Sequence, residues 1–506
     1  MEGRCMRFWI GLPFILSCIF CIVVCAQDDD IDVSDSGVDQ KRIDEAVKKG
    51  VEWLLAKQQA DGSWLASGTQ GIEASYPGGT TALVLLALLK GGVNPNDPRI
   101  LKGFQFCFNV AKKPVPAGGL TPPGDESEAG GFEKRTYSVS CLILALAARY
   151  QPRPKSESEE KKAEKKGKGM TEPYEEQMRR NFGQQATPED KKMMEDLVKW
   201  LLSKQQTNIW RYPGAAQDGN NEDASNTQYA MLALYTAWRL GYPIPTDVWI
   251  KVADYFLKNQ EKDGPKVEWF PVPGADFPIS ELKKMEKKAL KEMEKAVKSG
   301  EVDPKKLRTE ATIEDPYKKF GEEKREMKAR GWSYITKCIK EQVPEFERVC
   351  GSMTTSGVAA MMICKAALEG TPYYQQNKNA IDQSIRDGCA WLAHNFSVST
   401  NPAKGGYHYY YLYGLERASV LSLVRKMGKH DWWKEGAEYL LGAQTADGSW
   451  PGSEQGGRQG GDVTSPLVNT CFAILFLKKA TMPLVKLPEQ IYSGEGLGIG
   501  KKGGEK

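Results

Sequence analysis

The sequence predicts an all-α protein in which six outer and six inner helices form two concentric rings, an (α/α)6 toroid. Two observations carry this prediction: one segment occurs near both ends of the chain, and two kinds of helix alternate between them. In the first copy an aromatic residue and leucine precede Gln58, and Gly-Ser-Trp ends the segment at Trp64. The second copy has Gln444 and Trp450 at the matching places. Such repeats decide the architecture of a chain before other signals do.

The first kind of helix is apolar on one face. Val47, Val51, Leu54 and Leu55 follow the i, i+4, i+7, i+8 spacing of an amphipathic helix. The same spacing begins again at five further places, namely Ile100, Met194, Trp249, Ile385 and Trp433. We expect these six helices to form the outer ring.

The second kind of helix is small and apolar on nearly every side, which predicts burial on every side. It follows each one-faced helix, at residues 80–89, 138–147, 226–234, 354–363, 411–420 and 468–477. The alternative arrangement is an open solenoid of helical pairs. An open array needs polar caps, whereas the terminal repeats here are the best-formed copies. Closure into a ring is therefore favoured.

The repeats assign one domain to residues 41–481 of the 506-residue chain. Two charged inserts interrupt it. Residues 151–192 begin with a run too charged to bury, so disorder is expected there. Residues 278–330 carry apolar residues at helical spacing, which predicts a helical excursion lying on the ring. The Gly/Lys-rich residues 482–506 are expected to form a flexible tail.

The N-terminus predicts export. Residues 1–26 combine early arginines with an apolar run and a small-residue cleavage site, as in a signal peptide, and an acidic linker follows at 27–40. The alternative is a retained anchor, because the apolar run at 8–25 is marginal for crossing a membrane. A periplasmic or secreted protein is therefore expected, with membrane association only through residues 8–25 if they are not cleaved.

Composition limits the partners and cofactors. The net charge is +4 and no basic patch is interleaved with aromatic residues, so no nucleic-acid partner is predicted. Only 3 histidines occur in the chain, which leaves few ligands for zinc, and neither a metal nor a cofactor is predicted. Cys338 and Cys350 flank a polar loop, and in an exported protein a disulfide between them is expected.

The Gln-x3-Gly-Ser-Trp endings resemble the QW motif of squalene-hopene and oxidosqualene cyclases. The helical repeats resemble the wider terpenoid-cyclase toroid family, which includes the protein prenyltransferase β subunits. In those cyclases the glutamine bonds near a helix terminus and the tryptophan stacks on it, tying outer helices together. The resemblance thus implies structural roles for Gln58, Trp64, Gln444 and Trp450.

The catalytic signatures of that family do not match. An acidic run similar to the Asp-x-Asp-Asp motif of the cyclases occurs only at 28–35, outside the repeats. The zinc ligands of the prenyltransferases are not matched either. His408 is shifted by one residue from the position of their zinc-binding histidine, and residues 352–355 are Ser-Met-Thr-Thr where an Asp-x-Cys pair is expected.

The geometry of a ring predicts where a site would lie. When outer and inner helices alternate, all inner helices run the same way and their N-termini meet at one mouth. Free N–H groups and helix dipoles there favour an anion. The residues expected at this mouth are Thr80, Tyr137, Asn226, Thr354, His408 and Asn469. Asp223 is either the cap of its helix or a functional carboxylate, and the dipoles are expected to lower its pKa.

Charged and aromatic residues inside the last inner helices complete the candidates. Glu416 and Arg417 form either an internal ion pair or a contact for a ligand. Half of the tyrosines around His408 are expected to line the cavity. The candidate catalytic residues are Asp223, His408, Tyr411 and Glu416. The candidate ligand-binding residues are Tyr137, Asn226, Trp332, Tyr413 and Arg417.

Two functions remain open at this point. The first is an exported enzyme of isoprenoid-cyclase type, of the isomerase or transferase class, acting on an apolar or phosphorylated substrate. Asp223 would be its acid, and Tyr411 or Tyr413 would stabilise a cation. The second is a non-catalytic toroid that binds a lipid, a glycan or a protein outside the cytoplasm. Fold alone does not choose between them, because function depends on the site.

Overall fold

The protein is mostly helical, and the predicted all-α class is confirmed. The computed structural model describes residues 39–65, 78–112, 135–152, 173–211, 223–298, 325–334, 348–451 and 465–485. Within this part of the chain, no helix is both long and apolar enough to cross a membrane. The predicted signal peptide and most of the acidic linker lie outside the described residues.

All six one-faced stripes form helices. They are α1 (Gln40–Ala56), α4 (Pro98–Lys112), α8 (Pro188–Ser203), α10 (Thr246–Lys258), α16 (Pro372–His394) and α18 (Trp432–Ala443). Side-chain caps begin several of them: Thr187, Thr371 and Asp431 each accept a hydrogen bond from a backbone N–H of the first turn. The local sequence therefore sets where these helices start.

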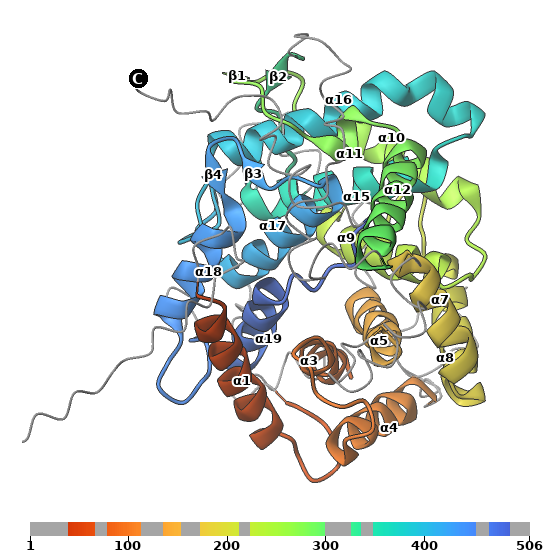
Figure 1. Ribbon diagram of the computed structural model, residues 1–506, viewed down its shortest axis with the longest axis vertical. Coiled ribbons are helices and arrows are strands. Elements are labelled where there is room, and N and C mark those ends of the chain that lie inside the picture. Colours follow the sequence, from red (N-terminus) through yellow and green to blue (C-terminus); the bar gives the residue numbers. More distant parts are fainter. Residues whose placement is uncertain are drawn as a thin grey trace, which may run out of the picture.

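The six apolar segments form a second set of helices. They are α3 (Gly79–Lys90), α5 (Thr136–Arg149), α9 (Ala224–Arg239), α15 (Gly351–Leu368), α17 (His408–Ser422) and α19 (Pro466–Leu477). Each packs against the next in this order, and α19 packs against α3, so their contacts form a closed cycle. Figure 1 shows this set in the middle of the molecule, with the one-faced helices around it.

The same tryptophan contacts occur four times. The indole Nε1 of Trp64 donates to the carbonyl of Leu54 at 2.7 Å, and its backbone N–H donates to Thr81 Oγ1 at 3.0 Å. Each tryptophan thus joins the end of an outer helix to a threonine of an inner helix. The other three copies are Trp210 with Leu201 and Thr227, Trp332 with Phe256 and Thr354, and Trp450 with Leu440 and Thr470.

Four glutamines join neighbouring outer helices through their side-chain amides. Gln58, Gln205, Gln260 and Gln444 donate to carbonyls of Arg99 in α4, Val248 in α10, Ser384 in α16 and Ala46 in α1, respectively. The last bond, at 2.9 Å, connects α18 to α1 and so links the two ends of the domain. The turn beside Gln58 needs glycine, because Gly62 has φ 95° and an added Cβ would lie 2.7 Å from the Lys102 carbonyl.

The expectation of disorder over 151–192 is wrong for its second half. Helix α7 (Tyr174–Gln185) and the start of α8 lie there, while 153–172 is outside the described residues. Met178 and Phe182 are one turn apart and buried, and the Phe182 ring packs edge-on against Tyr150. This apolar pair gives α7 a face to bury, although most of its other residues are polar.

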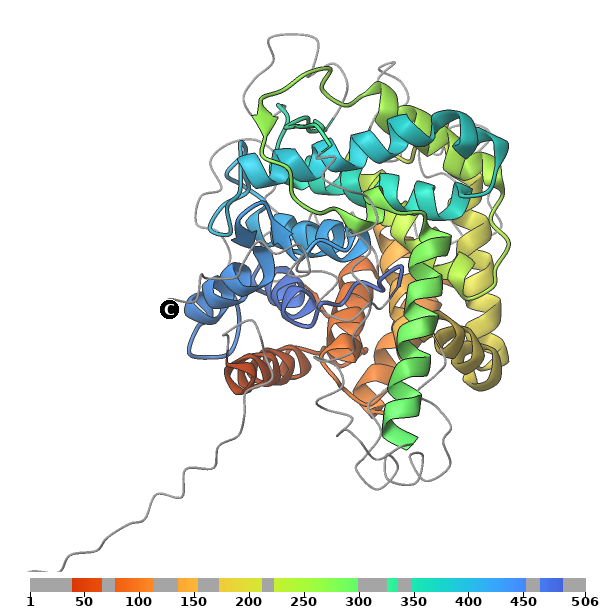
Figure 2. The same cartoon turned by 45° about the horizontal axis from the view of Figure 1, so that its top comes forward.

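The second excursion is helical over 279–298, as predicted, and its residues 299–324 lie outside the described residues. Strand β1 (Lys266–Val267) pairs antiparallel with β2 (Met327–Lys328), and between them lie α11 (Pro273–Asp276) and α12 (Ile279–Lys298). Figure 2 shows α12, in green, as a long helix on the outside of the bundle, and its Leu282 is fully buried. A small hairpin of β3 (Lys426–Met427) and β4 (His430–Asp431) joins α17 to α18.

Candidate functional site

A buried cation lies among the inner helices. Arg417 of α17 is 0% exposed, and its guanidinium lies 4.1 Å from the ring centre of Tyr413 and 5.0 Å from that of Tyr229. Its Nη2 donates to Gln228 Oε1 at 2.8 Å, and its Nη1 donates to the Tyr229 hydroxyl at 3.4 Å. Within the described residues no carboxylate lies at ion-pair distance from Arg417. Its partners are therefore neutral.

The polar network continues from Arg417 towards half-buried tyrosines. Gln228 also bonds through its Nε2 to the hydroxyl of Tyr410. The Tyr410 ring stacks on the Tyr229 ring, with their centres 6.1 Å apart. The ring of Tyr137 in α5 also contacts Tyr229, with a distance of 4.7 Å between the ring centres. Tyr137 and Tyr410 are only half-buried. Of the predicted ligand-binding residues, Tyr137, Tyr413 and Arg417 thus come together, whereas Gln228, Tyr229 and Tyr410 were not predicted.

First-turn and second-turn residues of neighbouring inner helices lie side by side. An added Cβ on Gly79 would come within 2.6 Å of Ser138 Oγ, and one on Gly414 would come within 2.4 Å of Thr355 Oγ1. The Tyr410 ring contacts Phe472 at 6.0 Å. These pairs connect α3 with α5, α15 with α17, and α17 with α19. The N-terminal turns of these helices therefore lie at the same end, which we call the mouth.

Asp223 caps α9 and accepts four hydrogen bonds. Its Oδ1 accepts from Asn226 N at 2.9 Å and Ser225 Oγ at 2.7 Å, and its Oδ2 accepts from Asn226 Nδ2 and the Tyr334 hydroxyl, each at 2.7 Å. Burial raises the pKa of Asp223, against the expected lowering, because the loss of solvation outweighs these donors. Asn226, a predicted ligand-binding residue, acts here as a partner of the cap.

His408 and Tyr411 lie on another side of α17. His408 Nε2 is 2.8 Å from the Val398 carbonyl, and its ring packs edge-on against Tyr439 of α18. The Tyr411 hydroxyl donates to the Ser397 carbonyl at 3.1 Å. Both residues therefore fix the loop before α17 instead of joining the Arg417 network. Burial lowers the pKa of His408.

Trp332 was expected to bind a ligand, but its contacts match those of Trp64. It is 1% exposed, and its indole donates to the Phe256 carbonyl at 2.8 Å. Sequence reasoning missed this role because Gln260 and Trp332 are separated by the whole excursion that holds β1, α11, α12 and β2. The signal was Gln260, which carries the QW-type amide at the matching place.

A C-terminal strap closes the end opposite the mouth. The strap, residues 480–485, is held where Thr481 donates from its N and Oγ1 to Glu416, at 2.9 and 2.6 Å, and where Arg239 donates to the Pro483 carbonyl at 2.5 Å. Under it lies a cavity of about 40 Å³, lined among others by Leu86, Leu144, Leu232, Tyr413 and Met482. This volume holds a few water molecules and no isoprenoid chain.

Glu416 is fully buried and does not form an ion pair with Arg417 within the described residues. Its two hydrogen bonds come from Thr481, and Arg417 and Lys90 are the charged groups near enough to act on it. Burial raises the pKa of Glu416 to about 7, because these contacts replace only part of the lost solvation. Glu416 thus holds the strap and is remote from the mouth.

The raised pKa of Glu416 predicts a pH dependence of stability. Because the folded protein binds this proton more tightly than the unfolded chain, the stabilisation is complete below pH 4.5 and is lost as pH rises through about 7. The expected loss is about 3 kcal/mol. Urea unfolding at several pH values would measure it, with Glu416→Gln as the neutral reference. If the free energy of unfolding of the wild type changes with pH in the same way as that of Glu416→Gln, the prediction is wrong.

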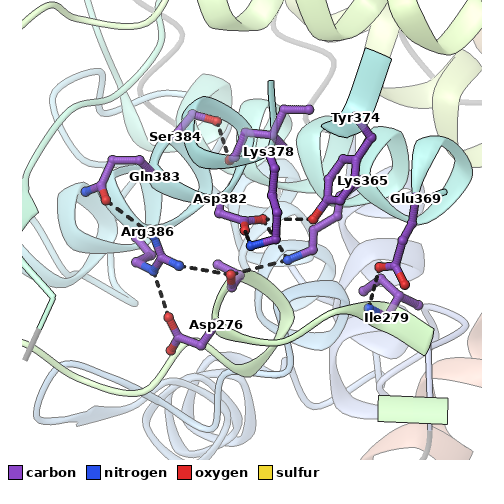
Figure 3. Close-up of polar contacts among 12 residues, drawn as sticks. Asp276, Ile279, Lys365, Glu369, Tyr374, Lys378, Asp382, Gln383, Ser384 and Arg386 are labelled. Atoms are coloured by element: carbon purple, nitrogen blue, oxygen red, sulfur yellow. Dashed lines mark hydrogen bonds and ion pairs between the residues drawn. The ribbon is translucent and has the colours of Figure 1, made fainter. Parts of the chain in front are cut away.

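A second buried polar cluster anchors the excursion to α15 and α16 (Figure 3). Lys365 is 0% exposed, and its Nζ donates to Asp382 Oδ1 at 2.7 Å and to the Ala275 carbonyl at 3.2 Å. Arg386 bonds Asp276 at 2.7 Å and the same Ala275 carbonyl at 3.0 Å. Each cation has a carboxylate partner, as buried charges require. The cluster therefore has a structural role.

The described residues include one of the two cysteines of the predicted disulfide. Cys350 is a buried free thiol, and Cys338 lies outside the described residues, so the disulfide between them stays a prediction. No group of three or more metal-ligating side chains occurs in the described part of the chain.

Comparison of the sequence with protein-family models and with curated proteins gives no match.

Proposed function

We propose that the twelve repeat helices form a closed (α/α)6 toroid of the terpenoid-cyclase type. The closed cycle of contacts from α3 through α19 and back to α3 supports this arrangement. So does the Gln444 bond to Ala46, which joins the last outer helix to the first. An open solenoid would leave both of these terminal surfaces without a partner.

We further propose that this toroid is a binding protein and not a cyclase. The observation that carries the proposal is Arg417, a buried guanidinium among the inner helices. A cyclase stabilises a carbocation with free aromatic faces. Here the faces of Tyr413 and Tyr229 are already taken by Arg417, whose fixed charge would also repel a second cation.

The candidate acids also favour binding over cyclisation. Both oxygens of Asp223 bond to protein donors, so neither oxygen is directed at a substrate in the mouth, although burial raises the pKa of this carboxyl group. Glu416, whose pKa is about 7, faces the strap at the other end. Neither carboxyl group is placed to protonate an alkene at the mouth.

The proposed ligand therefore enters at the mouth and reaches the half-buried Tyr137 and Tyr410. Tyrosine offers both an apolar face and a hydroxyl, which suits a ligand of mixed polarity. With the predicted signal peptide, the partner would be a molecule found outside the cytoplasm.

Two measurements test this function. Incubation with squalene or geranylgeranyl diphosphate should give no cyclised product by gas chromatography and mass spectrometry. Native mass spectrometry of the gently purified protein should show a bound small molecule. Tyr410→Phe should weaken that complex, whereas the matched variant Tyr439→Phe on α18 should not. A cyclised product that disappears in Asp223→Asn would overturn the binding proposal in favour of the enzyme.

A further inference from the structure

Arg417 differs from the other buried cations of the protein. Four lysine or arginine side chains are buried within the described residues. Three have a carboxylate partner: Arg239 lies 3.5 Å from Glu175, Lys365 lies 2.7 Å from Asp382, and Arg386 lies 2.7 Å from Asp276. Within the described residues, Arg417 bonds only to tyrosines and Gln228, and the neighbouring Glu416 acts on it without forming an ion pair. A buried charge without a counter-charge is costly, and aromatic faces and neutral acceptors offset only part of that cost.

The guanidinium also keeps an unused donor. Arg417 Nε is buried without a hydrogen-bond partner, while Nη2 bonds to Gln228 Oε1 at 2.8 Å. Nε and one terminal nitrogen form the edge of the guanidinium fork that a planar carboxylate binds with two parallel bonds. The amide oxygen of Gln228 therefore occupies the place of a carboxylate oxygen on one nitrogen of Arg417, and the Nε donor has no acceptor.

The surroundings also favour an anion. The side chain of a helical residue points towards the N-terminus of its helix, so Arg417 extends from the third turn of α17 towards the mouth. It lies beside the ring of Tyr413 and within 5.9 Å of the ring centre of Tyr410, which is half-buried. Helix N-terminal turns gather at this end, and their dipoles add positive potential.

We propose that Arg417 binds the carboxylate group of the ligand, with Gln228 holding its place when no ligand is bound. This inference rests on the proposed binding function and names the chemistry of the same site. The ligand class is a small carboxylate, either a free organic acid or the acid group of a sugar acid or of a peptide terminus. Its carboxylate would supply the directly bonded counter-charge that Arg417 lacks among the described residues.

Thermal unfolding of the full chain at constant ionic strength tests the proposal, with sodium acetate, sodium glucuronate and triglycine as probes and sodium chloride as the reference. In the wild type, carboxylates should raise Tm with concentration, as binding to the folded state requires. A larger rise in Tm with glucuronate than with acetate would indicate a sugar acid as the ligand. A larger rise with triglycine than with acetate would indicate a peptide terminus. Calorimetric titration would give the corresponding Kd.

Gln228→Glu is the decisive variant, because it supplies Arg417 with a permanent carboxylate. Its Tm without ligand should exceed that of the wild type by several degrees, and its response to carboxylates should be lost. The matched variant Gln260→Glu replaces a buried glutamine that donates to two carbonyls. It should lower Tm and leave the carboxylate response intact.

The outcomes separate the two proposals. If Gln228→Glu lowers Tm and no carboxylate raises the Tm of the wild type, the carboxylate inference is overturned. A bound neutral molecule in native mass spectrometry would then leave the binding function standing. A cyclised product would overturn the binding function itself. Arg417→Met should abolish the carboxylate response while keeping the volume of the side chain, and a retained response in this variant would also refute the inference.

Discussion

Replacement of Trp332 with alanine should lower the free energy of unfolding by roughly 3–5 kcal/mol, as for other fully buried tryptophans. The ring is enclosed by inner and outer helices: an added Cβ on Gly357 would lie 2.3 Å from it, and one on Gly388 would lie 2.7 Å from it. Truncation would therefore leave a cavity and remove the indole donor from the Phe256 carbonyl. Urea unfolding followed by circular dichroism would measure the change.

A matched control for this prediction is Trp53→Ala. Trp53 is only partly buried, and its indole N–H donates to the carboxylate of the exposed residue Asp447. Its loss should cost much less than the loss of Trp332. If Trp332→Ala instead keeps wild-type stability and loses the bound ligand, Trp332 belongs to the ligand site, as the sequence first indicated.

Replacement of Asp382 with alanine should cost a similar amount, roughly 3–5 kcal/mol, because it leaves Lys365 buried without its carboxylate. Figure 3 shows how the Asp382 carboxylate lies between Lys365, Lys378 and Tyr374. Burial already lowers the pKa of Lys365, since the low-polarity surroundings disfavour its charge. Without Asp382, we expect Lys365 to lose its proton or the excursion to detach from α15.

The double variant Lys365→Met, Asp382→Leu distinguishes a stranded charge from lost packing. It should recover most of the stability lost in Asp382→Ala, because no buried charge remains. Asp247→Ala, which breaks an exposed pair with Lys251 on α10, is the control and should change stability by no more than about 0.5 kcal/mol. A double variant as unstable as Asp382→Ala would show that the cost does not come from the unpaired lysine.

The helices themselves could be predicted from the sequence. Their signals are local: an apolar stripe with a period of 3.6 residues, or an apolar run with no polar face, produces the same helix wherever it lies. The turns at Gln58 and Gln444 could be predicted as well, because the glutamine and the tryptophan of each pair are only a few residues apart in the sequence. The α7 helix was missed because the charged start of its insert hid the apolar pair of Met178 and Phe182.

The site depended on tertiary structure. Arg417 and its partner Gln228 are 189 residues apart, so no local pattern shows whether the arginine meets a carboxylate or an amide. Likewise, the periodicity of α17 does not show which of its sides faces the other inner helices. That side determines whether Tyr410 or His408 joins the Arg417 network. The direction of the Asp223 pKa shift also followed from burial, a property of the packed helices. The sequence alone thus determined which helices form, through short-range backbone and side-chain preferences. Packing decided which polar groups meet and how far water is excluded from them.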